Sequence, residues 1–172
     1  MHLLKDGGRA AVVLPDGTLF GEGIKTRIKE QLLETCNLHT VIRLPNGVFN
    51  PYTGIKTNLL FFTKGMPTQD VWFYEHPYPV GYKNYSKTKP MRIEEFAAEK
   101  AWWNNRDENE FAWKVGIEEI KARNYNLDIK NPHSPDQISH DPETLIAEYR
   151  EIQSKITGLK TQLMHMLGES FQ

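Results

Sequence analysis

The sequence predicts an α/β fold in which a small sheet forms the second half of a larger one. Three short apolar runs, at 10–14, 38–44 and 57–63, show little polar alternation, as is typical of strands buried on both faces. A helical pattern separates the first two runs. Since this block offers one clear helix, either later helices cover the sheet or the chain is a piece of a larger domain. We favour the second, because Met1–Lys5 leads almost directly into the first strand.

The first predicted strand is Ala10–Leu14, an aliphatic run that Pro15 ends. A helix is predicted at Gly23–Thr35. Its apolar residues recur every four positions and are Ile24, Ile28 and Leu32. Because residues four apart share one face of a helix, we expect this stripe to face the core. The charged residues between them, including Lys29, are expected to face water.

The second predicted strand, Leu38–Leu44, ends at Pro45. A strand, a crossover helix and a second strand form a βαβ unit whose two strands run in the same direction. The loop that follows, 46–56, is too short for another crossover helix. The third strand, Thr57–Thr63, is therefore expected to run antiparallel to the second.

The region after residue 64 is less regular. Its expected elements are a strand at 71–74, helices at 93–102 and 115–123, and an extended segment at 125–129. Four large aromatic residues lie near one another in sequence: Trp102, Trp103, Phe111 and Trp113. Such a group more often forms a small second core than a ligand site.

Composition places the chain among ordinary globular proteins. It has 172 residues, of which 39% are hydrophobic and 25% charged, with a net charge of −1. Cys36 is the only cysteine, which excludes an internal disulfide and favours the cytoplasm. No apolar run approaches the ~20 residues that span a membrane, so we expect a soluble protein without a membrane partner.

Charge is distributed unevenly along the chain. Residues 1–92 carry 12 Lys and Arg against 7 Asp and Glu, whereas residues 93–172 carry 9 against 15. In the loop 81–92, lysines alternate with tyrosines. This mixture suits phosphate contacts with base stacking, although a solvated loop would look the same. The candidate contact residues are Lys83, Lys87 and Lys89.

The last 30 residues contain a heptad pattern, and a long helix is predicted at 142–167. Its apolar seam contains Leu145, Tyr149, Ile152, Ile156, Leu159 and Leu163. Such a seam docks on a partner helix or packs on its own domain, and the pattern alone does not decide between them. We therefore expect three regions: the sheet at 1–92, a helical and irregular connection at 93–140, and the C-terminal helix at 141–172.

Conventional catalytic and metal motifs are absent from the sequence. The six histidines have no HExxH or CxxC companion, and no GxxxxGKS phosphate loop occurs. We therefore assign no metal site and no catalytic residue.

Three segments bring a family resemblance: GGRAAVVLPDGTLFG at 7–21, HTVIRLPNGVFNPYTGIKTNLLFFTK at 39–64 and EEIKARNYNLDIKNP at 118–132. They resemble the modification subunit of type I restriction-modification systems, a DNA adenine-N6 methyltransferase. The resemblance implies the distal half of a Rossmann-like S-adenosylmethionine-dependent methyltransferase sheet. It also implies a closing antiparallel hairpin and an α-helical C-terminal tail.

The resemblance implies methyl transfer from S-adenosylmethionine to adenine N6 in a specific DNA site. In such subunits the donor loop and the Asn-Pro-Pro-aromatic motif precede the strand at 10–14, so we expect a C-terminal fragment that is inactive alone and binds no S-adenosylmethionine. The segment Asn50-Pro51-Tyr52 lacks one proline of that motif and lies in a late loop. We assign it no catalysis.

The resemblance further implies that Phe49 stacks on the flipped adenine, although a hydrophobic plug for its own loop is the alternative. Lys56, Thr57 and Asn58 would line the same cleft or contact phosphate. The implied partners are DNA, the specificity subunit, on which the C-terminal helix would dock, and the restriction subunit. A non-catalytic module for helix docking or DNA contact is the alternative function.

Overall fold

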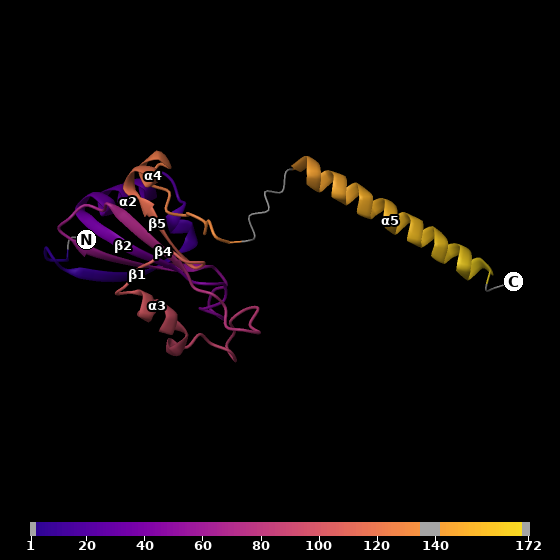
Figure 1. Ribbon diagram of the computed structural model, residues 1–172, viewed down its shortest axis with the longest axis horizontal. Helices are drawn as coiled ribbons and strands as arrows, with labels where there is room; N and C mark the ends of the chain where they lie inside the picture. The colour runs from indigo at the N-terminus through magenta and orange to yellow at the C-terminus, as the bar shows by residue number, and fades with distance from the viewer. Residues whose placement is uncertain (1–2, 135–141, 170–172) are drawn as a thin grey trace. The chain divides into compact units, whose positions relative to one another are not determined.

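The computed structural model describes residues 3–134 and 142–169 (Figure 1). The chain divides into two compact units, residues 1–134 and 135–172. Residues 93–134 belong to the same unit as the sheet.

A five-stranded sheet forms the centre of the first unit, in the order β1-β3-β2-β4-β5. The strands are β1 (Arg9–Pro15), β2 (Cys36–Arg43), β3 (Thr57–Lys64), β4 (Asp70–Glu75) and β5 (Ala112–Gly116). The expected antiparallel pairing of β2 with β3 is confirmed. Strand β3 also pairs antiparallel with β1, so β1 and β2 run in the same direction with β3 between them. Strand β4 is parallel to β2, and β5 is antiparallel to β4.

Helical segments lie between these strands and, as α4, directly after the last one. They are α1 (Asp16–Leu19), α2 (Ile24–Thr35), the 3-10 turn η1 (Ile93–Phe96), α3 (Ala97–Trp102) and α4 (Ile117–Ala122). The expected helix at 93–102 is confirmed as η1 followed by α3. The expected helix at 115–123 begins too early, because Val115 and Gly116 still pair with β4.

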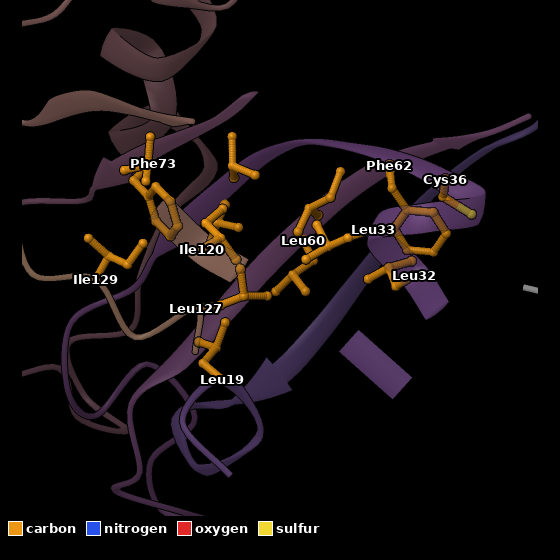
Figure 2. Packing of buried hydrophobic residues seen from close by; sticks show 14 of the residues in the cluster. Leu19, Leu32, Leu33, Cys36, Leu60, Phe62, Phe73, Ile120, Leu127 and Ile129 are labelled. Carbon is orange, nitrogen blue, oxygen red and sulfur yellow. The ribbon is translucent and has the colours of Figure 1, made fainter. Parts of the chain in front are cut away.

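The main core lies between α2 and one face of the sheet. Figure 2 shows its side chains converging from α2, the sheet, α4 and the segment after α4. The labelled members are Leu19, Leu32, Leu33, Cys36, Leu60, Phe62, Phe73, Ile120, Leu127 and Ile129. Removing such aliphatic side chains from water stabilises the fold by roughly 1.5–3 kcal/mol each.

The expected orientation of α2 is partly wrong. Leu32 faces the core, but Ile24 and Ile28 are 77% and 53% exposed, and Leu33 is buried instead. Lys29 is only 5% exposed. Its ammonium donates to the carbonyl oxygens of Leu19 and Gly21 at 2.6 and 3.0 Å, and these bonds compensate for its burial.

A second core covers the other face of the sheet, where η1 and α3 pack. Its buried members are Ile42, Leu44, Tyr74, Trp102 and Ala112, with Val48, Phe96, Trp103 and Phe111 packed against them. The expected aromatic cluster therefore forms for Trp102, Trp103 and Phe111 but not for Trp113. Successive side chains of a strand point to opposite faces, so Trp113 joins the main core, where it stacks on Phe73.

Strand β1 differs from the expected strand buried on both faces. Val12 and Val13 are 37% and 50% exposed. Within the described residues, β1 pairs with β3 alone and so forms an edge of the sheet. The apolar run of β1 is thus typical of a central strand, although here it occupies an edge.

The second unit contains α5 (Pro142–Glu169), which confirms the predicted C-terminal helix. Seam residues with described side chains are exposed: Tyr149, Ile152, Ile156, Leu159 and Leu163. The side chain of Leu145 lies outside the described residues. Among the described helices, none is both long and apolar enough to cross a membrane.

Candidate nucleic-acid interface

Three loops meet at the carboxyl edge of the sheet. Strands β1, β2 and β4 run in the same direction, so the chain leaves each of them at the same edge. Ligands of α/β sheets bind at such an edge. The loops there are the start of α1, the β2–β3 loop at 44–56, and the long loop at 76–92 that follows β4.

The β2–β3 loop carries Phe49. Three hydrogen bonds between backbone groups hold its turn. The Asn50 backbone N–H donates to the Gly47 carbonyl at 3.0 Å, and the backbone N–H groups of Tyr52 and Thr53 donate to the Phe49 carbonyl at 2.9 and 3.2 Å. The Phe49 side chain is 39% exposed, whereas Tyr52 is 93% exposed. Phe49 thus combines a well-defined backbone with an accessible ring.

The loop at 76–92 packs against the β2–β3 loop. The Tyr78 hydroxyl donates to the Asn46 carbonyl at 3.0 Å. The side-chain nitrogen of Asn50 donates to the Tyr85 carbonyl at 2.8 Å. Tyr85 is fully buried, and its hydroxyl donates to the Glu95 carboxylate. Burial, together with that carboxylate, raises the pKa of Tyr85 well above its ordinary value. Two segments singled out separately from the sequence are therefore adjacent.

Exposed cations lie on both of these loops. Lys83, Lys87 and Lys89 are exposed on the long loop, and Lys56 is exposed at the end of the shorter one. The Lys89 ammonium lies 5.3 Å from the centre of the Tyr82 ring, which packs on Tyr85. This arrangement leaves the ammonium groups accessible to phosphate while the tyrosines fix the loop.

Thr57 and Asn58, in contrast, are 7% and 1% exposed. The Asn58 amide donates to the Asp16 carboxylate at 3.0 Å. The Thr57 hydroxyl is buried and forms no hydrogen bond within the described part of the chain. Both residues lie at the start of β3, beside the exposed Lys56, and their contact with DNA stays a prediction.

Arg43 connects the carboxyl edge to the segment after α4, a contact that sequence reasoning missed. Its guanidinium donates to the Asp128 carboxylate and to the Ile129 carbonyl, each at 2.7 Å, and lies 3.6 Å from Asp16. A cavity of about 20 Å³, enough for one water molecule, lies beside these groups. The only signal in the sequence was that Arg43 and Asp128 fall within two of the three family segments.

A buried pair of His76 and Glu99, each 3% exposed, was also missed. The His76 imidazole forms a hydrogen bond with the Glu99 carboxylate. The backbone N–H of His76 donates to the Arg43 carbonyl at 2.9 Å. The pair joins α3 to the end of β4. In the described ranges, no three His, Cys, Asp or Glu side chains lie close enough to hold a metal ion.

Comparison with known proteins gives consistent results. The family model described as N-6 DNA Methylase matches residues 1–141. The type I restriction enzyme EcoEI methylase subunit of Escherichia coli is 66% identical over 98% of this chain, and the match spans 36% of that relative's length.

Solved structures agree. A modification subunit of a putative type I restriction enzyme from Vibrio vulnificus has 51% identity and a TM-score of 0.74, covering 81% of this chain and 30% of that one. A chain from a structural study of complex assembly in the type I R-M system has 36% identity and a TM-score of 0.73, covering 96% and 37%. The family expected from the sequence is thereby confirmed, and the chain belongs to the N-6 DNA methylase family.

Proposed function

We propose that this chain supplies the target-base wall and the docking helix of a type I modification methylase. Such an enzyme transfers a methyl group from S-adenosylmethionine to adenine N6 in a specific DNA site. The observation that carries the proposal is the half-exposed Phe49 ring on a loop braced at the carboxyl edge of the sheet, beside exposed lysines.

The chemistry requires such a wall. An adenine in a duplex must leave the base stack before its N6 amine can meet the methyl donor, and this costs a few kcal/mol. Stacking on an aromatic side chain returns about 1–3 kcal/mol. Phe49 would supply this face, while Lys56, Lys83, Lys87 and Lys89 would contact the phosphates. Thr57 and Asn58 would complete the floor of the cleft.

The donor site would come from the part of the methylase that this chain does not match. We infer that strands of the donor-binding half pair with the edge of β1, because that strand is apolar and, in the described residues, bonded on one side only. The Asn-Pro-Pro-aromatic motif would lie on that half. We assign no catalysis to Asn50, whose side-chain nitrogen donates to the Tyr85 carbonyl and so holds its own loop.

The helix α5 would dock on the specificity subunit. Its seam repeats every three and four residues and presents side chains such as Ile152 and Leu159, which are 56% and 65% exposed. A helix with this pattern is suited to pack in a groove between other helices. The restriction subunit would join the same complex. The alternative function is a non-catalytic docking module, and the seam of α5 is the one observation that favours it.

A chimera tests the proposal. The matching segment of the E. coli EcoEI methylase subunit is replaced by this chain, and the chimera is assembled with the specificity subunit of that system. Phe49→Ala should lower kcat for methylation by roughly 5- to 150-fold, the kinetic equivalent of a lost stacking contact, with unchanged affinity for S-adenosylmethionine.

The matched control is Tyr52→Ala, which removes a 93% exposed aromatic ring from the same loop and should leave kcat unchanged. Equal turnover of the Phe49→Ala variant and the parent chimera would remove Phe49 from the site. A chimera that assembles but does not methylate would favour the docking module.

A further inference from the structure

We propose that Asn50 is a positioning residue for Phe49, and that Tyr78 and Tyr85 complete a two-point brace that fixes the Phe49 loop at the carboxyl edge of the sheet. The brace consists of the hydrogen bonds from Asn50 to the Tyr85 carbonyl and from Tyr78 to the Asn46 carbonyl. This inference rests on the proposed function, because it assigns to Phe49 the stacking role stated above.

The two bonds hold the loop on either side of Phe49. Asn46 precedes Phe49 by three residues, and Asn50 follows it directly. The backbone of the intervening turn is closed by the bond from the Asn50 amide to the Gly47 carbonyl at 3.0 Å. With both ends of one turn held at 3.0 and 2.8 Å by the neighbouring loop, little freedom is left to the backbone that carries the ring.

Close packing at Gly47 supports the same conclusion. Gly47 has a φ of +80°. A Cβ atom there would lie 2.7 Å from the side-chain nitrogen of Asn50 and 2.8 Å from the Tyr85 carbonyl oxygen. It would also lie 2.2 Å from the side-chain oxygen of Asn84. The two loops therefore approach so closely that only glycine fits between them.

The other side of the brace is itself anchored. The Tyr85 ring is fully buried, with its centre 5.5 Å from that of Tyr78, and its hydroxyl donates to Glu95 in η1. Glu95 also accepts from the Arg92 backbone amide at 2.8 Å. The next residue, Phe96, packs in the second core. Contacts through Asn50 and Tyr85 thus connect the Phe49 loop to η1, which packs against the sheet.

The brace gives the Asn50-Pro51-Tyr52 segment a role other than catalysis. The Asn50 side-chain nitrogen donates to a carbonyl of its own chain, so this side chain is used to hold the loop. Asn50 acts through Phe49 and does not touch the base.

The test uses the full chain with 4-fluorophenylalanine placed at position 49, observed by fluorine NMR. The parent should give one resonance displaced from that of the chain in urea. Asn50→Asp keeps the side-chain shape but turns the donor into an acceptor facing the Tyr85 carbonyl, so the resonance should move toward the urea position and broaden. Tyr78→Phe, which removes the second bond alone, should act in the same direction by a smaller amount.

Two controls keep the result specific. Asn104→Asp makes the same change at an exposed position after α3 and should leave the resonance in place. The melting temperature of each variant, followed by circular dichroism, separates a local effect on Phe49 from loss of the fold. An Asn50→Asp chain that melts like the parent and keeps the parent resonance would overturn the brace, as would a resonance that moves only together with the melting temperature.

The brace and the proposed function fail in different ways. If the resonance responds to Asn50→Asp but Phe49→Ala leaves methylation by the chimera unchanged, the brace exists and the stacking role is wrong. If both hold, Asn50→Asp in the chimera should lower kcat and leave the KM for DNA unchanged, which is the kinetic signature of a positioning residue.

Discussion

Arg43 connects three segments at the carboxyl edge of the sheet. Its planar guanidinium donates one hydrogen bond to the Asp128 carboxylate and one to the Ile129 carbonyl, and it lies 3.6 Å from the Asp16 carboxylate. These groups come from the end of β2, the start of α1 and the segment after α4. One side chain therefore holds in register three segments that surround the base of the Phe49 loop.

Arg43→Met should lower the free energy of unfolding by about 2 kcal/mol, because two partly buried carboxylates lose their cation. Urea denaturation of the chain measures this change. The matched control is Lys121→Met, which breaks the exposed pair with Glu118 and should leave the free energy of unfolding nearly unchanged. Equal effects of the two substitutions would mean that Arg43 contributes no more than a surface ion pair.

His39 predicts a pH dependence of stability. Burial, with a further contribution from Arg106, lowers the pKa of His39 below its ordinary value of 6.5. The unfolded chain therefore binds more protons than the folded chain just below pH 6.5, so stability is greatest above that pH and falls as the pH decreases. Urea unfolding at about pH 7.5 and about pH 5.5 should show this loss, and His39→Gln should reduce it. A variant with the full parental loss would contradict the assignment.

The sequence pattern predicted where the strands and helices lie better than it predicted which of their side chains are buried. Turn residues and loop length correctly predicted that β2 and β3 are antiparallel, since a short loop permits no other pairing. The face of α2 could not be predicted from spacing, because the burial of Lys29 depends on two carbonyls of the loop around Leu19. The contact between Arg43 and Asp128 was also missed, because these residues are 85 positions apart and meet only in the folded chain. Phe49 was found only through the family resemblance.

The helix α5 carries its own prediction. Replacing Ile152 and Ile156 together by lysine should weaken binding to the specificity subunit by roughly 100-fold, because two apolar side chains worth about 1.5 kcal/mol each leave the interface. Calorimetry of the chimera with that subunit measures the affinity. Ser154→Lys with Thr161→Lys adds the same charge to the opposite face of the helix and should bind like the parent. A seam variant that binds equally well would show that α5 docks elsewhere.

In the part of the chain that the structure describes, β1 is an edge strand, which agrees with the family membership. A strand as apolar as β1 is typical of a sheet interior, yet Val13 is 50% exposed here. The chain spans 36% of the length of its E. coli relative, so the remaining part of a methylase would provide the neighbouring strands. Catalysis would then depend on pairing at this edge.

The same reasoning predicts the behaviour of the chain with the methyl donor. Isothermal calorimetry should detect no binding of S-adenosylmethionine to this chain, because its residues contain no glycine-rich donor loop after a strand. The chimera, in which the donor-binding half is present, should bind the donor as the E. coli parent does. Micromolar binding by the isolated chain would contradict the division of the site between two halves.

Fluorescence of 2-aminopurine reports whether Phe49 stacks on the flipped base. The chimera is bound to DNA in which 2-aminopurine replaces the target adenine, since this base is bright when unstacked and quenched when stacked on an aromatic ring. We predict that the flipped base is quenched in the parent chimera and in Tyr52→Ala, and that it becomes bright in Phe49→Ala. The same fluorescence in all three complexes would contradict the account.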